Sequence, residues 1–156
     1  MEVNIIKAEE KHFVDCVIAL QKSELGRLHF SEENSAAKAI NEGISKGEIF
    51  VAVTNEDLCV GFIWVVKNGA FHSFPYLHLI AVKEEYRNHG IGKKLLQYFE
   101  DTNAKKYSKL FLVVADFNKG AKRLYQSMGY QEVCVIPDLY KKGIAEYLMM
   151  KRIQSS

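Results

Sequence analysis

Apolar residues in the first third of the chain recur at intervals of three and four, which is typical of amphipathic helices. Phe13 and Val17 belong to one such stripe, and Ile40 and Ile44 belong to a second. Between the two stripes the helical spacing is interrupted. The predicted elements are a strand over residues 3–8, a helix over 9–23, a loop over 25–30, and a helix that Ser31 caps and that ends near Gly43 or Gly47.

The middle of the chain changes to short runs of β-branched and aromatic residues, which are typical of strands. Residues 55–57 have the composition of a hairpin turn between the first two runs, and the third run follows Asn68-Gly69. We therefore expect consecutive strands joined by tight turns. The predicted strands cover residues 48–54, 59–67 and 74–83.

Helices and strands alternate in the last third of the chain. Ile91, Leu95 and Phe99 share one face of a long amphipathic helix. Gly129 fits the position just after a shorter helix, where a positive φ is needed. The predicted elements are a helix over residues 90–106, a strand over 110–115, a helix over 118–128, and strands over 131–136 and 144–153.

The order of these elements is β-α-α-β-β-β-α-β-α-β-β. It predicts an α/β protein of the α+β type, with a mixed, mostly antiparallel sheet of about seven strands and helices on both faces. A doubly wound sheet would alternate strands and helices from its start. Because no linker, repeat or charge block divides the sequence, we expect residues 1–156 to form a single domain.

Composition and charge narrow the classes of function. Apolar residues make up 48% of the chain, and 21 basic residues nearly balance 19 acidic ones, which argues against a dedicated nucleic-acid binder. The apolar runs are too short for a membrane helix, and the first eight residues lack a signal-peptide pattern. Cys16, Cys59 and Cys134 lie far apart in apolar runs, which predicts buried thiols rather than disulfides or a metal site. We expect a cytoplasmic protein with no metal, nucleic-acid or membrane partner.

The segment with the most specific chemistry is a turn between a predicted strand and the long helix. Its residues are Arg87-Asn88-His89-Gly90-Ile91-Gly92-Lys93. Backbone N–H groups at a helix N-terminus lack intrahelical partners and carry a partial positive charge. Gly90 and Gly92 remove the Cβ atoms that would keep a phosphate away, while Arg87 and Lys93 add cations. The turn therefore predicts an anion site suited to a pyrophosphate.

Two familiar phosphate-binding loops fit this turn poorly. A dinucleotide-binding fingerprint needs a third glycine that the residues after Gly92 do not supply. A P-loop needs Ser or Thr where Lys94 stands. A nicotinamide-dependent enzyme is therefore the weaker interpretation, and a loop merely shaped by its glycines is the structural alternative.

Arg87-x-x-Gly90-x-Gly92, between a strand and a long helix, resembles the phosphate-binding motif of the GNAT superfamily of acetyl-coenzyme A-dependent N-acetyltransferases. Asn118-x-x-Ala121-x-x-Leu124-Tyr125, followed by Gly129-Tyr130, is similar to the second signature of the family. The clear resemblance covers residues 76–133. It implies transfer of an acetyl group from acetyl-CoA to a primary amine of a small molecule, peptide or protein, by direct attack in a ternary complex. The alternative is a regulatory module that binds acyl-CoA without turnover, and a monomer and a homodimer are both compatible with the sequence.

The resemblance also implies which residues contact acetyl-CoA. In the family, the strand before the turn splays from its neighbour, so that its backbone pairs with the pantetheine arm. Tyr125 matches the tyrosine that commonly lies beside the thioester sulfur and protonates the leaving thiolate, although its helical face would also suit a core tyrosine. The implied cofactor-binding residues are Ile80, Ala81, Val82, Arg87, Asn88, His89, Gly90, Ile91, Gly92, Lys93, Asn118 and Tyr125.

The sequence leaves the identity of the base open, because Tyr76 stands where many relatives have a glutamate. His78 lies two residues further along and titrates near neutrality, which makes it a candidate base. A regular strand would place Tyr76, His78, Ile80 and Val82 on one face. An ordinary cross-strand histidine is the alternative to a catalytic one.

Further candidates come from the turn and from the predicted loop after the first helix. Glu84 and Glu85 are alternative bases in the turn. In this family, the first two helices and the loop between them usually wall the acceptor pocket. His29, Phe30 and Tyr76 are therefore the candidate acceptor-binding residues, and sealing the edge of the core is their alternative role.

Overall fold

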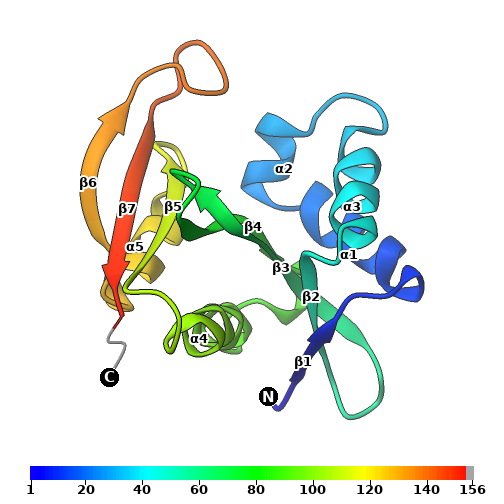
Figure 1. Ribbon diagram of the computed structural model, residues 1–156. Coiled ribbons are helices and arrows are strands. Elements are labelled where there is room, and N and C mark those ends of the chain that lie inside the picture. The colour runs from blue at the N-terminus through cyan, green and yellow to red at the C-terminus, as the bar shows by residue number, and fades with distance from the viewer. Residues whose placement is uncertain (154–156) are drawn as a thin grey trace. The chain divides into compact units, whose positions relative to one another are not determined.

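The computed structural model describes residues 1–153, which contain seven strands, five α-helices and two short 3-10 helices (Figure 1). In chain order these are β1 (Asn4–Lys7), η1 (Glu10–His12), α1 (Phe13–Gln21), α2 (Glu24–His29), α3 (Ser35–Ser45), β2 (Ile49–Val53), β3 (Cys59–Ala70), β4 (Phe74–Val82), η2 (Glu84–Tyr86), α4 (Ile91–Asn103), β5 (Lys109–Ala115), α5 (Lys119–Ser127), β6 (Gln131–Ile136) and β7 (Glu146–Arg152). Within residues 1–153, no helix has the length and apolarity needed to cross a membrane.

The chain divides into two compact units. Unit 1 comprises Met1–Val65 and Leu79–Tyr98, and unit 2 comprises Val66–His78 and the chain from Phe99 onward. The strands hydrogen-bond in the order β1-β2-β3-β4-β5-β7-β6. The recorded pairings are antiparallel except for β4 with β5, which are parallel. This order confirms the predicted mixed, mostly antiparallel sheet.

Helices cover both faces of the strands in unit 1. On one face, the side chain of Ile49 in β2 lies against Gly43 of α3. On the other face, the ring of Phe50 lies 5.1 Å from the ring of Tyr98 in α4. Adjacent strand residues point to opposite faces. The arrangement therefore confirms helices on both faces, and it explains why Gly43 lies inside α3 rather than at its end.

Helix α2 replaces the loop that the sequence predicts over residues 25–30. Ser23 caps this helix, because its hydroxyl accepts a hydrogen bond from the N–H of Gly26 at 2.9 Å. A Cβ on Gly26 would lie 1.7 Å from the carbonyl oxygen of Leu20, so this glycine permits a close approach rather than breaking the helix. Helix α3 also begins later than predicted, because its N-cap is Asn34 rather than Ser31.

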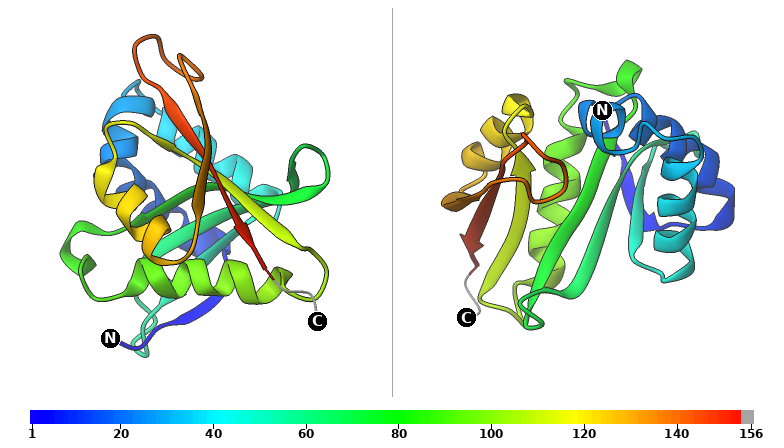
Figure 2. Two further views of the ribbon diagram at one scale, coloured as in Figure 1. Left: turned by 90° about the vertical axis from the view of Figure 1, so that its left-hand side faces the viewer. Right: turned by 90° about the horizontal axis from the view of Figure 1, so that it is seen from above.

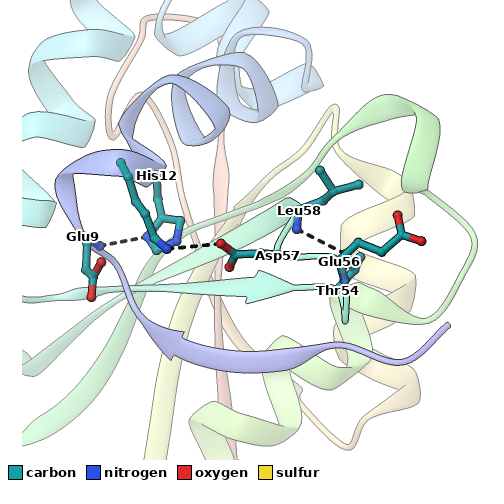
Figure 3. Close-up of polar contacts among 7 residues, drawn as sticks. Glu9, His12, Thr54, Glu56, Asp57 and Leu58 are labelled. Atoms are coloured by element: carbon teal, nitrogen blue, oxygen red, sulfur yellow. Dashed lines mark hydrogen bonds and ion pairs between the residues drawn. The ribbon is translucent and has the colours of Figure 1, made fainter.

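The turn between β2 and β3 lies where the sequence predicts it. The hydroxyl of Thr54 accepts a hydrogen bond from the N–H of Leu58 at 3.2 Å, and Asp57 takes a left-handed φ of 62°. The carboxylate of Asp57 also forms an ion pair with Lys11 of η1 at 3.3 Å (Figure 3). The turn is therefore connected to the start of the helical segment.

The predicted end of the strand over 59–67 is too early, because β3 continues through Asn68 and Gly69 to Ala70. The chain turns instead at Phe71 and His72, which have φ values of 54° and 60°. A Cβ on Gly69 would lie 2.9 Å from the Cβ of Tyr76 in β4. The glycine thus marks a close approach between strands, and not a turn.

In unit 2, α5 lies beside β6 and β7 (Figure 2), and the last residues of α4 contact β7 through Glu100. Lys122 of α5 lies 3.4 Å above the ring of Tyr147 and forms a 2.6 Å ion pair with Glu132 of β6. Lys151 of β7 forms a 2.6 Å ion pair with Glu100 near the end of α4. Alternate residues of a strand share a face, so Tyr147 and Lys151 define the helix-covered face of β7.

The three cysteines are free thiols. Cys16 and Cys59 are buried and hydrogen-bonded to each other, and this bond, together with burial, raises the pKa of Cys16. The predicted burial is confirmed for these two residues. It is wrong for Cys134, which is exposed because it lies on β6, the edge strand of the sheet.

Candidate active site

Strand β4 presents one half-buried face. Burial alternates without interruption along the whole strand, so that Tyr76, His78, Ile80 and Val82 share this face. The expectation from strand periodicity is therefore confirmed. Ala81 lies between the last two of these residues and is buried on the opposite face.

The parallel pairing of β4 with β5 involves few residues. Tyr76 lies opposite Phe111, and Leu77 lies opposite Leu112. Strand β4 itself runs on to Val82. A short parallel ladder followed by a longer strand is the arrangement that the family resemblance implies before the phosphate turn.

The turn before α4 has a left-handed backbone at two positions. Asn88 has a φ of 65° and Gly90 a φ of 77°. The N–H of Lys94 donates to the carbonyl oxygen of Gly90 at 3.1 Å, which is the first helical hydrogen bond of α4. A Cβ on Gly90 would meet no atom within 4 Å, so the space beside it is open. The first N–H groups of the helix follow this glycine and lack intrahelical partners.

A hydrogen bond and an ion pair connect this turn to α1 and to its C-cap residue. Arg87 donates from Nε to the carbonyl oxygen of Val82 at 3.3 Å and from Nη2 to that of Lys22 at 2.9 Å. Lys83, just after β4, forms an ion pair with Asp15 of α1. A guanidinium group has five N–H donors, so these two bonds leave Arg87 with donors for an anion.

The predicted cofactor residues of this turn differ in their exposure. Ile91 is buried in the core. Arg87 and Gly92 are half-buried. The exposed ones are Asn88, His89, Gly90 and Lys93. The backbone and cations at the turn are therefore open to a ligand, while Ile91 anchors the helix.

Helix α5 places the two predicted residues of the second signature. The Oδ1 atom of Asn118 accepts a hydrogen bond from the N–H of Ala121 at 3.4 Å and caps the helix. Tyr125 is 4% exposed, and its ring packs edge-on against Tyr130 with 6.0 Å between centroids. Burial raises the pKa of the Tyr125 hydroxyl, which therefore stays protonated at neutral pH.

Tyr76 is the centre of a cluster of ionisable groups in unit 2. Its hydroxyl lies 3.4 Å from that of Tyr140, which is in the loop between β6 and β7 and is 55% exposed. Burial, the hydrogen bond with Tyr140 and the nearby charge of Glu146 all raise the pKa of Tyr76. Tyr125 also interacts electrostatically with Tyr76. The cluster therefore joins β4, α5, β7 and the β6–β7 loop, which stands at the top of Figure 1.

Glu146 is a functional candidate that the sequence did not reveal. It is the first residue of β7, is 2% exposed, and lies opposite Ala115 of β5 and Ile136 of β6. Burial and the nearby carboxylate of Asp116 raise its pKa from 4.5 to about 7. Asp116 itself accepts a hydrogen bond from the N–H of Ala145 at 3.1 Å.

The other predicted candidates differ in their burial and in the unit that holds them. His78 is half-buried, and its ring centroid lies 6.4 Å from that of Tyr76. His29 is the last residue of α2 and Phe30 follows it, both half-buried within unit 1. The two glutamates at the start of η2 are exposed.

Comparison with known proteins gives a consistent result. A family model described as an acetyltransferase (GNAT) domain matches residues 45–132. The chain is 29% identical to N-alpha-acetyltransferase RimI of Mycobacterium tuberculosis over 104 residues, which cover 66% of this chain and 65% of that protein. It is 39% identical to an N-alpha-acetyltransferase of Sulfurisphaera tokodaii over 72 residues, covering 45% of this chain and 43% of that protein.

The fold is also similar to solved structures. The crystal structure of the ribosomal-protein-S18-alanine N-acetyltransferase from Escherichia coli superposes with a TM-score of 0.76 at 20% identity, covering 99% of this chain and 96% of that one. In sequence, the chain spans from 28% to 65% of the length of the curated relatives that it matches. The likeness in structure therefore extends further than the likeness in sequence.

Proposed function

Because this chain belongs to the GNAT acetyltransferase family, we propose that it transfers an acetyl group from acetyl-CoA to a primary amine. The observation that carries the proposal is the turn before α4, where a left-handed Gly90 opens space beside the helix N-terminus. Members of the family use acetyl-CoA as the acetyl donor. Under this proposal, residues 1–156 act as one acetyltransferase domain.

The residues of the turn suit the pyrophosphate of acetyl-CoA. The N–H groups of Ile91, Gly92 and Lys93 begin a helix of 13 residues, whose dipole favours an anion at that end. Lys93 and Arg87 add positive charge. The backbone groups of β4 are proposed to pair with the pantetheine arm, and the Val82 N–H to stabilise the developing oxyanion. The full proposed set is Ile80, Ala81, Val82, Arg87, Asn88, His89, Gly90, Ile91, Gly92, Lys93, Asn118 and Tyr125.

Tyr125 is proposed to assist departure of the thiolate. Its pKa is raised above the ordinary value of 10, whereas a thiol has a pKa of about 8.5. A phenol that is a weaker acid than the leaving thiol stabilises the thiolate by donating a hydrogen bond, and complete transfer of its own proton is unfavourable. This refines the role that the family resemblance implies.

The acceptor is proposed to be the α-amine of a peptide or protein. Two relatives named N-alpha-acetyltransferases support this class of acceptor. We propose that the amine attacks directly in a ternary complex, because Cys16, Cys59 and Cys134 all lie outside the cofactor turn, so that none is an obvious acyl carrier. His29, Phe30 and Tyr76 remain the proposed acceptor-binding residues, and His78 remains a candidate base.

Ligand-dependent thermal unfolding tests the proposed donor. Acetyl-CoA at about 100 times its Kd should add about 2.7 kcal/mol of stability and raise Tm by roughly 5 to 10 °C. NADH is the matched control and should have no effect. A larger shift with NADH, or none with acetyl-CoA, would contradict the proposal.

A Tyr125→Phe variant separates an enzyme from a module that only binds acyl-CoA. If the protein is an acetyltransferase, the variant should lose kcat with peptide α-amines while its affinity for acetyl-CoA is unchanged. Tyr107→Phe is the control, because the Tyr107 hydroxyl donates to Asn68 at 3.4 Å and has no proposed catalytic role. Binding of acetyl-CoA without transfer to any amine by the wild-type protein would favour the regulatory module.

A further inference from the structure

The strand register of unit 2 places Glu146 on the same face of the sheet as Tyr76. Tyr76 lies opposite Phe111 of β5, and Phe111 lies opposite Met150 of β7. Residues directly opposite each other share a face, and so do alternate residues along one strand. Glu146 lies four residues before Met150 in β7, so these two residues also share that face. This face is opposite to the one that α4 and α5 contact through Lys151 and Tyr147.

The charge of Glu146 also acts on the hydroxyl of Tyr76. Burial and Tyr140 raise the pKa of Tyr76 most, and Glu146 of β7 and Tyr125 of α5 raise it further. Tyr140 lies against that hydroxyl from the exposed loop between β6 and β7. The charge of Glu146 is therefore close enough to affect Tyr76, whose side chain lies on the same face of the sheet.

We propose that Glu146 is the catalytic base, accepting a proton from the ammonium group of the acceptor directly or through one water molecule. The inference rests on the proposed acetyl transfer. The ammonium group gives one proton to the carboxylate, which leaves a neutral amine with a free electron pair. The amine then forms the C–N bond as the C–S bond breaks. A second proton passes from the nitrogen to the thiolate, to which Tyr125 donates a hydrogen bond, and Glu146 releases its proton to solvent.

The surroundings of Glu146 suit an α-amine. Burial and Asp116 both disfavour the charged carboxylate and bring its pKa to about 7, close to the value of about 7.7–8.0 for an α-amino group. Proton transfer between groups of similar pKa is nearly balanced, and a base is most efficient when its pKa lies near the working pH. The strand register places several other titratable groups on this face, namely Tyr76 and His78 of β4, Lys109 of β5, Cys134 of β6 and Arg152 of β7. Asp116 follows β5, Tyr140 lies in the loop between β6 and β7, and Tyr125 acts from α5.

A Glu146→Gln variant tests the role directly. With a peptide α-amine at pH 7, kcat should fall by about 100-fold or more, as general-base catalysis contributes about 10²- to 10⁴-fold. The affinity for acetyl-CoA should be unchanged. The matched control is Glu132→Gln, because Glu132 lies on β6 with its side chain toward Lys122 of α5, on the opposite face. Activity of Glu146→Gln equal to that of the wild type would overturn the inference.

An Asp116→Asn variant tests whether Glu146 acts as a base or only stabilises the fold. The measurement is the pH profile of kcat/KM, which a purely structural role of Glu146 would leave unchanged. The pH profile of kcat/KM in the wild type should fall below about pH 7, because the base must be ionised. Removing the like charge of Asp116 lowers the pKa of Glu146, so the fall should shift to lower pH. Asparagine keeps an oxygen that accepts the hydrogen bond from the N–H of Ala145. This variant decides the question even if Glu146→Gln does not fold.

Two outcomes distinguish the base from the rest of the function. The role of Glu146 alone is overturned if the wild type is active but Asp116→Asn leaves the pH profile of kcat/KM unchanged. It is also overturned if His78→Asn, instead, removes the fall of that profile at low pH. A wild type that binds no acetyl-CoA and acetylates no α-amine overturns the proposed function, and the role of Glu146 with it.

Discussion

Arg87 donates a hydrogen bond from Nη2 to the carbonyl oxygen of Lys22, which is the C-cap residue of α1, at 2.9 Å. The Nε atom of the same side chain donates to the carbonyl oxygen of Val82 at the end of β4. Arg87 therefore has a positioning role in the turn as well as a positive charge. A flexible ammonium group cannot reproduce both functions, because it lacks the planar fork of the guanidinium.

Replacing Arg87 should weaken the binding of acetyl-CoA. Hydrogen bonds of charged groups contribute about 1.5–3 kcal/mol each, so Arg87→Ala should raise the Kd at least about tenfold by calorimetry. Arg87→Lys should recover only part of this loss. Arg152→Ala at the exposed end of β7 is the control and should bind as the wild type does. An unchanged Kd for Arg87→Ala would exclude this residue from the anion site.

Gly90 should be replaceable only at a cost in backbone strain. A Cβ there meets no atom within 4 Å, but the φ of 77° is unfavourable for any L-residue with a side chain. Gly90→Ala should therefore lower the free energy of unfolding by about 1–2 kcal/mol and weaken acetyl-CoA binding. Gly120→Ala is a matched control in α5, where a Cβ also meets no atom within 4 Å and φ is not positive. Gly120→Ala should leave the free energy of unfolding unchanged or raise it. An equal loss of this free energy at both positions would contradict backbone strain at Gly90.

The ion pair between Lys151 and Glu100 should contribute measurably to stability. The Glu100 side chain is 7% exposed, so Lys151→Met leaves a buried carboxylate without its cation and should cost about 2 kcal/mol in urea unfolding. The exposed pair of Lys46 and Glu42 is the control, and Lys46→Met should cost less than about 0.5 kcal/mol. If both variants lose the same free energy of unfolding, burial does not determine how much these ion pairs contribute to stability.

Glu146 should make the stability of the protein depend on pH. Its pKa rises from 4.5 in an unfolded chain to about 7 in the folded one, so the folded state binds the proton more tightly. This stabilising effect is fully present below about pH 4.5 and is lost as the pH rises through about 7. Glu146→Gln should therefore raise Tm relative to the wild type more at pH 8 than at pH 5. Glu132→Gln should show no such difference, and a pH-independent effect of Glu146→Gln would argue against the raised pKa.

The sequence predicted the elements whose pattern is local. The stripe of Ile91, Leu95 and Phe99 correctly indicated α4, and polar residues correctly indicated the β2–β3 turn. The prediction was wrong at two glycines that allow close packing. Gly26 lies inside α2 and Gly69 inside β3, because at each of them a neighbouring atom occupies the place of a Cβ. Such a contact depends on residues distant in the sequence, so no local pattern reveals it.

The candidate site was predictable to a different degree in its two parts. The anion turn is contiguous, so the motif from Arg87 to Gly92 was visible directly. Glu146 was not, because it reaches the face of Tyr76 only through the register of β4, β5 and β7. A buried glutamate at the start of a strand carries no sequence signal, and Glu146 lies 70 positions after Tyr76.

The distribution of the thiols has a practical consequence for ligand-binding experiments. Cys16 and Cys59 are shielded within unit 1, whereas Cys134 is exposed on β6, opposite Leu148 of β7. A maleimide fluorophore should therefore label the native chain at one position without any engineered cysteine. Since β6 leads into the loop whose Tyr140 contacts the proposed acceptor-binding residue Tyr76, the label can test by fluorescence whether acceptor peptides bind near that loop.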